Sequence, residues 1–366
     1  MTKRLSAEHG VICSMGDERL GFFGWPSVAR TDSGKLWVAA SGPRYGHVCP
    51  FGRTSLFSSE DDGATWSGPR ILNDTPIDDR DCGLISLGGE RLCLTWFSSD
   101  SRRGWVAADI PEDEIKRWNV VKDAITDEAA DRWVGSWLRT SVDGGAWSDS
   151  YRTPVQSPHG PIRQANGDLL FFGKQWQIPG KLDVGQDRGE IMAARSSDEG
   201  KTWELLGSVP RPDYSDVNDF HEPHAIELPS GRLLGLVRYE YGGPEKAYEP
   251  FSLFQTESDD GGLTWSEMRP LWMIGSPAHL MMHSSGVIVC SYGYRTLPFG
   301  ERVMFSHDDG QTWDRDWILD ESPVRDLGYP SSVELGDGRI MTVYYQNNVR
   351  GTKNADLRYS IWELPV

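Results

Sequence analysis

Apolar residues alternate with polar residues in short stretches along most of the chain, and this spacing predicts antiparallel β-strands. Pairs of such stretches, joined by a glycine-containing turn, occur six times. The pairs cover residues 25–40, 80–96, 160–172, 222–238, 276–292 and 329–345. Self-similarity of this kind indicates a repeat architecture. Six hairpins predict six blades of sheet around one axis.

A second repeat is interleaved with the hairpins and has the form Ser-x-Asp-x-Gly-x-Thr-Trp. Full copies begin at Ser59, Ser196, Ser258 and Ser306, and a degenerate copy begins at Ser141. The Asp side chain can accept backbone N–H bonds, the glycine supplies a positive φ, and the tryptophan packs between sheets. We therefore expect structural turns between the third and fourth strands of a blade, and not catalytic aspartates.

Two segments depart from the repeat. Residues 106–136 have the apolar spacing of one or two helices. After the last hairpin only the strand-like stretch 358–366 follows, so we expect an N-terminal strand near residues 9–14 to close the last blade. The predicted fold is all-β, a six-bladed β-propeller formed by residues 1–366 as one domain, with a short helical insertion in the second blade.

The amino-acid composition limits the classes of partner that the chain is expected to bind. Sixteen tryptophans and forty glycines suit many short strands and tight turns. The net charge of -17 disfavours nucleic acid and anionic membranes, so any anionic ligand must meet a local arginine cluster. Five cysteines without a CxxC pair indicate reduced thiols, and the N-terminus lacks the apolar run of a signal peptide, which predicts a cytoplasmic protein.

The mouth of the propeller is the expected position of a reaction site, because the starts of all innermost strands converge there. The loops on this face are residues 42–54, 106–136, 173–189 and 238–250. Aligned on proline, the strand starts are Trp25, Arg80, Gly160, Glu222, Ser276 and Tyr329, and Asp81 can take the place of Arg80. His159, His221 and His224 flank these positions. On a strand His221 and His224 point to opposite faces, so we predict no metal site and no cofactor.

The Asp boxes and the six hairpins resemble those of the sialidase superfamily over nearly the whole chain. This resemblance implies that Tyr329 is the nucleophile and that Glu222 is its base. It also implies that Arg238 and Arg295 bind a substrate carboxylate through their planar guanidinium groups. A neutral phenol suits an anionic sugar, because a carboxylate nucleophile would repel it.

Two positions differ from the family pattern. The third family arginine is replaced by Trp25, and Arg80 is the candidate substitute, with Arg44 as a further anion-binding candidate. The loop that carries the acid/base Asp in the family, residues 42–54, has no carboxylate. His47 in this loop can donate the proton instead, and Asp79 and Asp81 are the other candidates. His159, His224 and Trp25 complete the predicted substrate-binding set.

The sequence thus favours an exo-glycoside hydrolase of the sialidase-like class that removes a terminal acidic sugar. Two alternatives use the same residues. One is a glycosidase or polysaccharide lyase acting on uronate- or rhamnose-containing glycans. The other is a carbohydrate-binding propeller without turnover. The expected partner is an anionic carbohydrate, and the sequence favours no particular oligomeric state.

Overall fold

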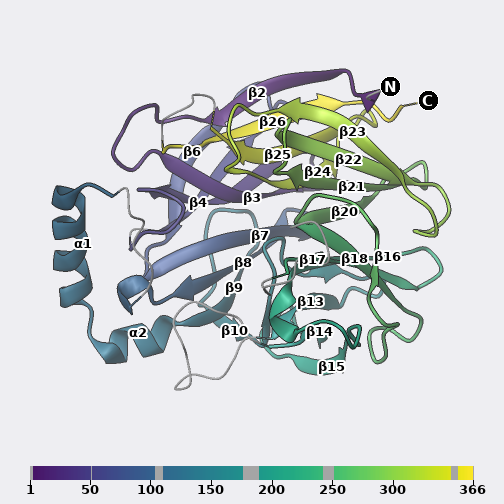
Figure 1. The fold of residues 1–366 in the computed structure, drawn as a ribbon, viewed down its shortest axis with the longest axis horizontal. Coiled ribbons are helices and arrows are strands. Elements are labelled where there is room, and N and C mark those ends of the chain that lie inside the picture. Colours follow the sequence, from purple (N-terminus) through teal and green to yellow (C-terminus); the bar gives the residue numbers. More distant parts are fainter. Residues whose placement is uncertain are drawn as a thin grey trace.

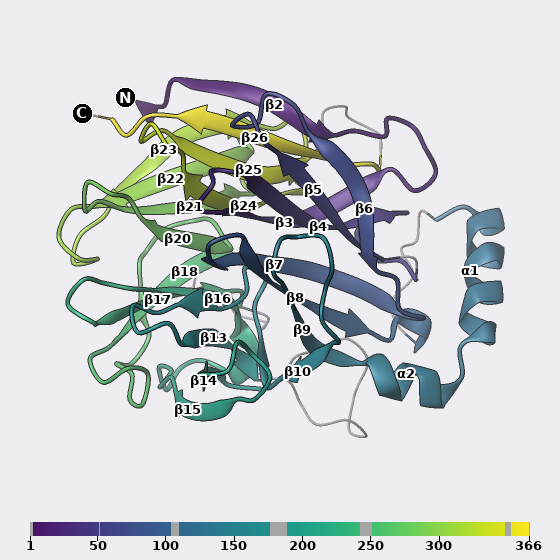
Figure 2. The same cartoon turned by 180° about the vertical axis from the view of Figure 1, so that it is seen from behind.

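Six sheets surround a central axis, and the chain builds them one after another (Figures 1 and 2). The structure is a computed structural model and describes residues 3–50, 52–103, 110–175, 189–241, 251–347 and 353–365. Inner strands of consecutive blades contact one another, and β24 of the last blade contacts β3 of the first, so the ring is closed. The predicted six-bladed β-propeller is confirmed.

Within each blade the strands follow one another from the axis to the rim. The first blade is formed by β3 (Phe22–Arg30), β4 (Leu36–Arg44), β5 (Thr54–Ser59) and β6 (Ser67–Asn73). The second is formed by β7 (Asp78–Gly88), β8 (Arg91–Ser99), β9 (Gly135–Ser141) and β10 (Tyr151–Thr153). The third is formed by β11 (Val155–Gln156), β12 (Ile162–Arg163), β13 (Leu169–Gln175), β14 (Ile191–Ser196) and β15 (Glu204–Ser208). In the third blade the innermost strand is split, because β11 and β12 both pair with β13.

The other three blades have the same order. The fourth is formed by β16 (Phe220–Glu227), β17 (Leu233–Tyr239), β18 (Ser252–Ser258) and β19 (Arg269–Pro270). The fifth is formed by β20 (Ala278–Met282), β21 (Ile288–Tyr294), β22 (Gly300–Ser306), β23 (Asp314–Glu321) and β1 (Lys3–Arg4). The sixth is formed by β24 (Leu327–Glu334), β25 (Ile340–Gln346), β26 (Asp356–Trp362) and β2 (Ala7–Cys13). Strand β2 pairs antiparallel with β26, so the predicted closure by an N-terminal strand is confirmed.

The Asp boxes form the turns between third and fourth strands, as predicted. In the first copy, Oδ1 of Asp61 accepts the N–H of Thr65 at 2.8 Å, and Oδ2 accepts its hydroxyl at 2.6 Å. The same two bonds recur at the aspartates Asp198, Asp260 and Asp308. The bonds from Thr65 lower the pKa of Asp61 to about 2. These carboxylates shape turns on the face opposite the mouth, away from the expected reaction site.

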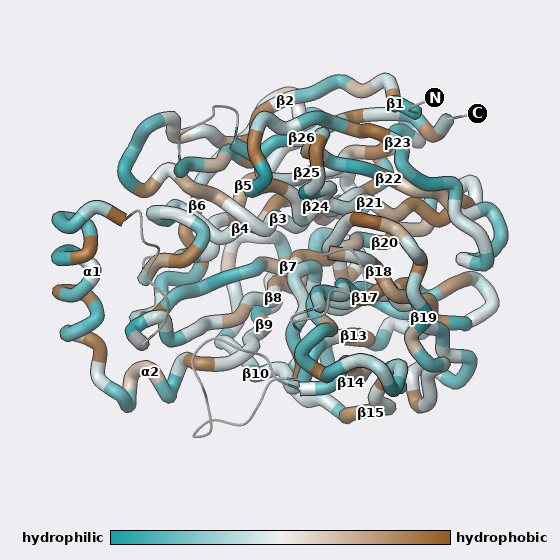
Figure 3. Tube along the Cα trace, viewed as in Figure 1, coloured by the Kyte–Doolittle hydropathy of each residue, from teal (hydrophilic) through white to brown (hydrophobic). Residues whose placement is uncertain are grey.

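The predicted insertion lies between β8 and β9 and begins with η1 (Ser101–Arg103). It contains α1 (Glu112–Ala124) and α2 (Asp127–Trp133), which stand outside the ring of sheets (Figures 1 and 2). In Figure 3 the colours along α1 alternate between teal and brown. No helix among the described residues is long and apolar enough to cross a membrane. Residues 104–109, together with residues 176–188 and 242–250 of the predicted mouth loops, lie outside the described residues.

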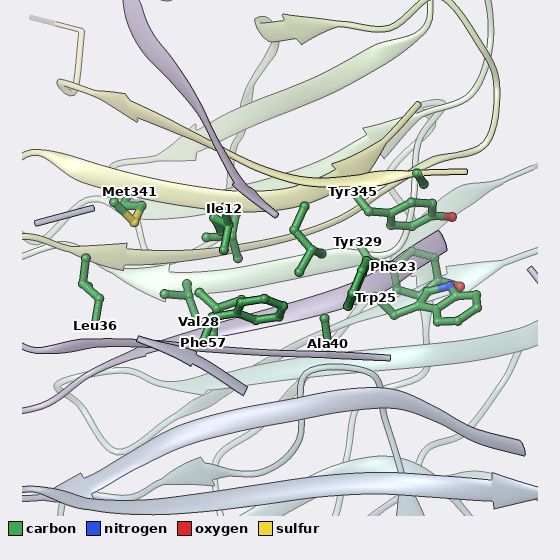
Figure 4. Packing of buried hydrophobic residues seen from close by; sticks show 14 of the residues in the cluster. Ile12, Phe23, Trp25, Val28, Leu36, Ala40, Phe57, Tyr329, Met341 and Tyr345 are labelled. Atoms are coloured by element: carbon green, nitrogen blue, oxygen red, sulfur yellow. The ribbon is translucent and has the colours of Figure 1, made fainter. Parts of the chain in front are cut away.

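The core consists of apolar clusters between neighbouring blades. The cluster between the last blade and the first extends from Leu36 and Met341 to Trp25, Tyr329 and Tyr345 (Figure 4). Tyr329 and Tyr345 therefore belong both to the core and to the edge of the mouth. The ring centroids of Trp25 and Tyr345 lie 6.3 and 6.1 Å from that of Tyr329, and this packing restricts its rotamer, since interiors are close-packed.

Three histidine rings pack together near the axis, with centroid separations of 5.6, 5.0 and 4.6 Å among His159, His224 and His279. Nδ1 of His224 accepts the N–H of Leu280 at 3.0 Å, and Nδ1 of His279 accepts the N–H of Ser332 at 3.2 Å. Each of these two bonds joins one blade to the next. Burial lowers the pKa of His224 to about 3 and that of His279 well below its usual value. The bonds between blades therefore need neutral imidazoles.

We expect acid to weaken the propeller through these histidines. A histidine whose folded pKa is depressed stabilises the fold above its unfolded pKa of about 6.5 and loses that contribution as pH falls toward the folded value. The variant His224→Asn should therefore reduce the pH dependence of the free energy of unfolding by up to about 1.4 kcal/mol per pH unit between about pH 6 and pH 4. Urea denaturation at several pH values measures this. The control is His307→Asn at an exposed turn; equal slopes in both variants would contradict the prediction.

Candidate active site

One residue near the start of four inner strands has a left-handed backbone. These residues are Trp25, Asp81, Glu222 and Tyr329, with φ of 54°, 43°, 46° and 52°. At each of them the pairing register with the second strand shifts, as in a β-bulge. A non-glycine residue in this region costs of order 1 kcal/mol or more, and such positions gather at functional sites. The shared backbone turns four different side chains toward the mouth.

The side chains of Tyr329, Glu222 and Arg238 meet, although they come from different parts of the chain. The Tyr329 hydroxyl donates to Oε1 of Glu222 at 2.5 Å. Nη1 of Arg238 donates to Oε2 of Glu222 at 2.5 Å and to the Tyr329 oxygen at 3.2 Å. Nη2 of Arg238 donates to Glu240 at 2.7 Å. Strands β16, β17 and β24 thus place a phenol, a carboxylate and a guanidinium in one hydrogen-bonded group.

The charges in this group favour a neutral phenol beside an ionised carboxylate. Burial opposes ionisation of Glu222, but Arg238 and the Tyr329 hydroxyl outweigh it and lower the pKa of the Glu222 carboxyl. Burial and the Glu222 charge raise the pKa of Tyr329 well above its usual value. The phenol therefore keeps its proton at rest, and the adjacent carboxylate can accept that proton when the oxygen forms a bond.

Asp81, and not Arg80, is the equivalent of Glu222 and Tyr329 in the second blade. The sequence left Arg80 and Asp81 open at this position, and the bulge, which falls after Arg80, selects Asp81. Burial raises the pKa of the Asp81 carboxyl to about 7, against the opposing charge of Arg80. Arg80 lies beside it, with Nε 3.9 Å from Asp81 Oδ1 and the guanidinium 4.6 Å from the centroid of Trp25. Asp81 can therefore carry a proton near neutral pH.

His47 lies at the rim of the mouth and is about half exposed. Its ring stands edge-on to Trp25 with centroids 5.0 Å apart, and Nδ1 lies 3.3 Å from Oδ1 of Asp326. The same Asp326 oxygen accepts the Tyr345 hydroxyl at 2.8 Å. Partial desolvation of the ring, with the positive charges of Arg80 and Arg295, lowers the pKa of His47, while Asp326 opposes this shift. An imidazole backed by a carboxylate can transfer a proton at the rim.

Guanidinium groups surround the ring of Phe251 on the mouth side. The guanidinium carbons of Arg238, Arg325 and Arg295 lie 4.8, 5.3 and 5.6 Å from the ring centroid. Arg295 donates through Nε and Nη2 to the carbonyl oxygen of Leu327, at 3.1 and 2.8 Å. Its guanidinium also lies 5.4 Å from the ring of Tyr329. This cluster is a local positive site in a chain of net charge -17.

Comparison with protein-family models matches residues 99–342, well over half of the chain, to a BNR repeat-like domain. The chain belongs to the BNR repeat-like domain family. A comparison with curated protein sequences finds no match.

Solved structures with similar folds include several sialidases. The BNR propeller aligns with a protein of unknown function from Dyadobacter fermentans at 20% identity and a TM-score of 0.73, covering 98% of each chain. It aligns with the intramolecular trans-sialidase of Ruminococcus gnavus, solved with oseltamivir carboxylate, at 18% identity and a TM-score of 0.64, covering 96% of this chain and 97% of that one. The sialidase of Trypanosoma rangeli in complex with sialic acid has 16% identity and a TM-score of 0.64, and the alignment covers 98% of this chain and 59% of that one. At these identities the likeness shows the fold.

Three residues of the predicted binding set, Arg44, His159 and His224, are at most 4% exposed. Arg44 is 0% exposed and pairs with Asp78 at 2.9 Å, and its other donors reach the hydroxyl of Ser41 and the backbone of the His47 loop. His159 and His224 belong to the axial histidine group. The contacts of these three side chains join structural elements, and their part in substrate binding stays a prediction. Trp25 is 1% exposed and forms a wall beneath His47 and Arg80.

Several residues of the site were absent from the sequence-based prediction. Asp326, Arg325 and Glu240 lie in or beside loops and belong to no repeat, so periodicity gives no signal for them. Arg325 and Asp326 stand just before β24, and their closeness to Tyr329 in the sequence was the one indication that they belong to the site. Among the described residues, no group of three or more His, Cys, Asp or Glu side chains is arranged to hold a metal ion.

The contact of Arg238 with two carboxylates predicts a large loss of stability in Arg238→Gln. Removing the guanidinium leaves Glu222, whose side chain is 15% exposed, without its cation, and breaking a buried pair from one side costs up to about 3–5 kcal/mol. Adding Glu222→Gln should recover part of this loss. The control is Arg232→Gln, which breaks an exposed pair with Asp259 and should cost less than about 1 kcal/mol. Chemical denaturation measures the free energy of unfolding of each variant. Similar losses in Arg238→Gln and Arg232→Gln would contradict the role of Arg238 as the cation that stabilises Glu222.

Proposed function

We propose that this protein is a sialidase-like exo-glycoside hydrolase that removes a terminal acidic sugar. The observation that carries the proposal is the hydrogen-bonded group of Tyr329, Glu222 and Arg238 at the mouth of the propeller. A buried phenol whose proton faces an ionised carboxylate is arranged for nucleophilic attack with general-base assistance. Sialidases are the group of glycosidases in which a tyrosine takes the place of the usual carboxylate nucleophile.

The proposal that the substrate is an acidic sugar rests on the positive charges around the nucleophile. Nη1 and Nη2 of Arg238 are directed to Glu222, Tyr329 and Glu240, so Arg238 mainly orients the Tyr329–Glu222 pair. Arg325 is then the group best placed to bind a carboxylate through paired N–H donors, and Arg295, whose Nε and Nη2 donate to Leu327, contributes its Nη1 and its charge. Arg80 provides a further cation on the side of Trp25 and replaces the arginine that the family places there.

His47 is the proposed acid/base group. It lies at the rim, where the leaving group emerges, and Asp326 holds Nδ1 so that Nε2 is available to the substrate. Asp81 lies deeper, with its Oδ1 buried, and we assign it to a sugar hydroxyl near the floor of the mouth. With a pKa of about 7, Asp81 is also the alternative proton donor.

The reaction proceeds in two balanced steps. Tyr329 Oη attacks the anomeric carbon and its proton moves to Glu222, while the bond to the leaving oxygen breaks and protonated His47 supplies a proton to that oxygen. Water then attacks the same carbon, gives a proton to His47, and the Tyr329 oxygen leaves and regains its proton from Glu222. The configuration at the anomeric carbon is retained, because it is inverted twice.

A uronate-containing glycan is the second candidate substrate, because the cations around Phe251 bind any carboxylate next to the scissile bond. Chromogenic sialosides and uronosides, tested side by side with analysis of the products, separate the two. An unsaturated uronate product would indicate elimination instead of hydrolysis. Binding of either sugar by calorimetry without any turnover would favour a binding propeller.

Tyr329→Phe removes the attacking oxygen and keeps the ring, so cleavage should fall at least about 10³-fold while sugar binding persists. Initial rates on an aryl glycoside, together with calorimetric binding, measure the two effects. The control is Tyr344→Phe, which removes a buried hydroxyl that contacts Asp320 and Ser360, outside the reacting group, and should reduce the rate far less. Turnover of Tyr329→Phe at the parental rate would refute the proposed nucleophile.

The pH profile distinguishes the two proton donors. His47 must be protonated to act as the acid and its pKa is lowered, so activity should fall as pH rises through a value below about 6.5. Asp326→Asn removes the charge that supports protonation, so this alkaline limb should move to lower pH. If Asp81 donates the proton, the limb stays near pH 7 in Asp326→Asn and His47→Asn, and only Asp81→Asn removes it.

A further inference from the structure

Helix α1 has only two buried side chains, Glu114 and Trp118, and both belong to one face of the helix. Residues four apart in a helix are neighbours on its surface. The indole N–H of Trp118 donates to Oε1 of Glu114 at 2.7 Å, so the two side chains form one unit. Val120 on the same helix is 72% exposed. The contacts of α1 with the propeller therefore centre on Glu114 and Trp118.

Glu114 fixes the helix to the loop that leads into the first blade. Nε of Arg19 donates to Oε2 of Glu114 at 2.8 Å, and Nη2 donates to Oε1 at 2.6 Å. The side chain of Glu114 is 5% exposed. A two-point pair between a guanidinium and a buried carboxylate sets orientation as well as distance, because both N–H bonds must be kept. Such a contact suits a fixed attachment and not a lid that opens in each turnover.

Trp118 packs on the loop that carries His47. Its ring stands edge-on to Tyr45, with centroids 5.5 Å apart. Tyr45 and Cys49 are buried with Trp118 in one cluster, and the Tyr45 N–H donates to Sγ of Cys49 at 3.3 Å. From the inner side, Arg44 donates to the carbonyl oxygens of Gly46 at 2.8 Å and His47 at 3.1 Å. The loop is thus held between Arg44 within the blade and Trp118 outside it.

We infer that α1 is a fixed support for the proton-transfer loop, and that Glu114 and Trp118 are positioning residues that act through Tyr45 on His47. The inference rests on the proposed function for its catalytic consequence. The groups that face His47 are Asp326 before β24, Arg80 and Asp78 on β7, Arg295 after β21, and the rings of Trp25 and Phe22 on β3. Displacement of the loop changes the distance of His47 from all of them together.

The test uses Trp118→Ala in the full chain, with Val120→Ala as the matched control on the same helix. The first readout is the titration of His47 by NMR of histidine-labelled protein, assigned through His47→Asn. It needs no turnover. We expect Trp118→Ala to shift the His47 ring signals and their midpoint, and Val120→Ala to leave both unchanged.

The second readout is kinetic. A displaced acid/base group slows the reaction without weakening sugar binding, so Trp118→Ala should lower kcat about 10-fold or more with little change in KM. The alkaline limb of the pH profile should move with the NMR midpoint. Trp118→Phe keeps a ring against Tyr45 and should restore most of kcat. Glu114→Gln tests the same role without removing the ring, should Trp118→Ala fail to fold.

The outcomes separate the two proposals. If Trp118→Ala and Glu114→Gln match Val120→Ala in the His47 titration and in kcat, the positioning role is overturned. If the His47 signals shift while the parent protein cleaves no glycoside, α1 still positions the loop and the proposed hydrolysis is wrong. If kcat falls but the His47 titration is unchanged, the effect does not pass through His47 and the inference is overturned.

Discussion

The contact between the Tyr329 hydroxyl and the Glu222 carboxylate controls the chemistry open to this propeller. A carboxylate as buried as Glu222 is unfavourable alone, and the guanidinium of Arg238 offsets that cost by contacting both partners. The result is a neutral phenol with a base already in place. In the proposed mechanism this pair attacks an anionic sugar without repelling it, and the arginines around Phe251 provide the complementary charge.

The fold supplies this contact through repetition. Four blades use the same left-handed bulge at the start of the inner strand, and the side chain on it differs from blade to blade: an indole, two carboxylates and a phenol. On the opposite face, the four full Asp boxes form the same hydrogen-bonded turn in four blades. Rigid strands thereby hold side chains from distant parts of the chain at hydrogen-bond distance, as the proposed catalysis requires.

Much of this arrangement follows from the sequence. The hairpins and Asp boxes are periodic and predict the blades, and the position of Tyr329 at a strand start predicts its place in the mouth. Features that depend on one-residue register or on packing do not follow. The bulge that selects Asp81 over Arg80 has no sequence signature, and the burial of Arg44 depends on Asp78 from the next blade. Asp326 reaches His47 only because the ring closes.

Direct capture of the proposed covalent glycosyl intermediate tests the central claim. A fluorinated sialic acid analogue with a good leaving group slows the second step, and intact-mass analysis followed by peptide mapping then locates the attached sugar. The proposed mechanism predicts one sugar per chain, on the peptide and the side chain of Tyr329. A sugar attached to any other side chain, or turnover of the analogue with inversion and without an adduct, would contradict it.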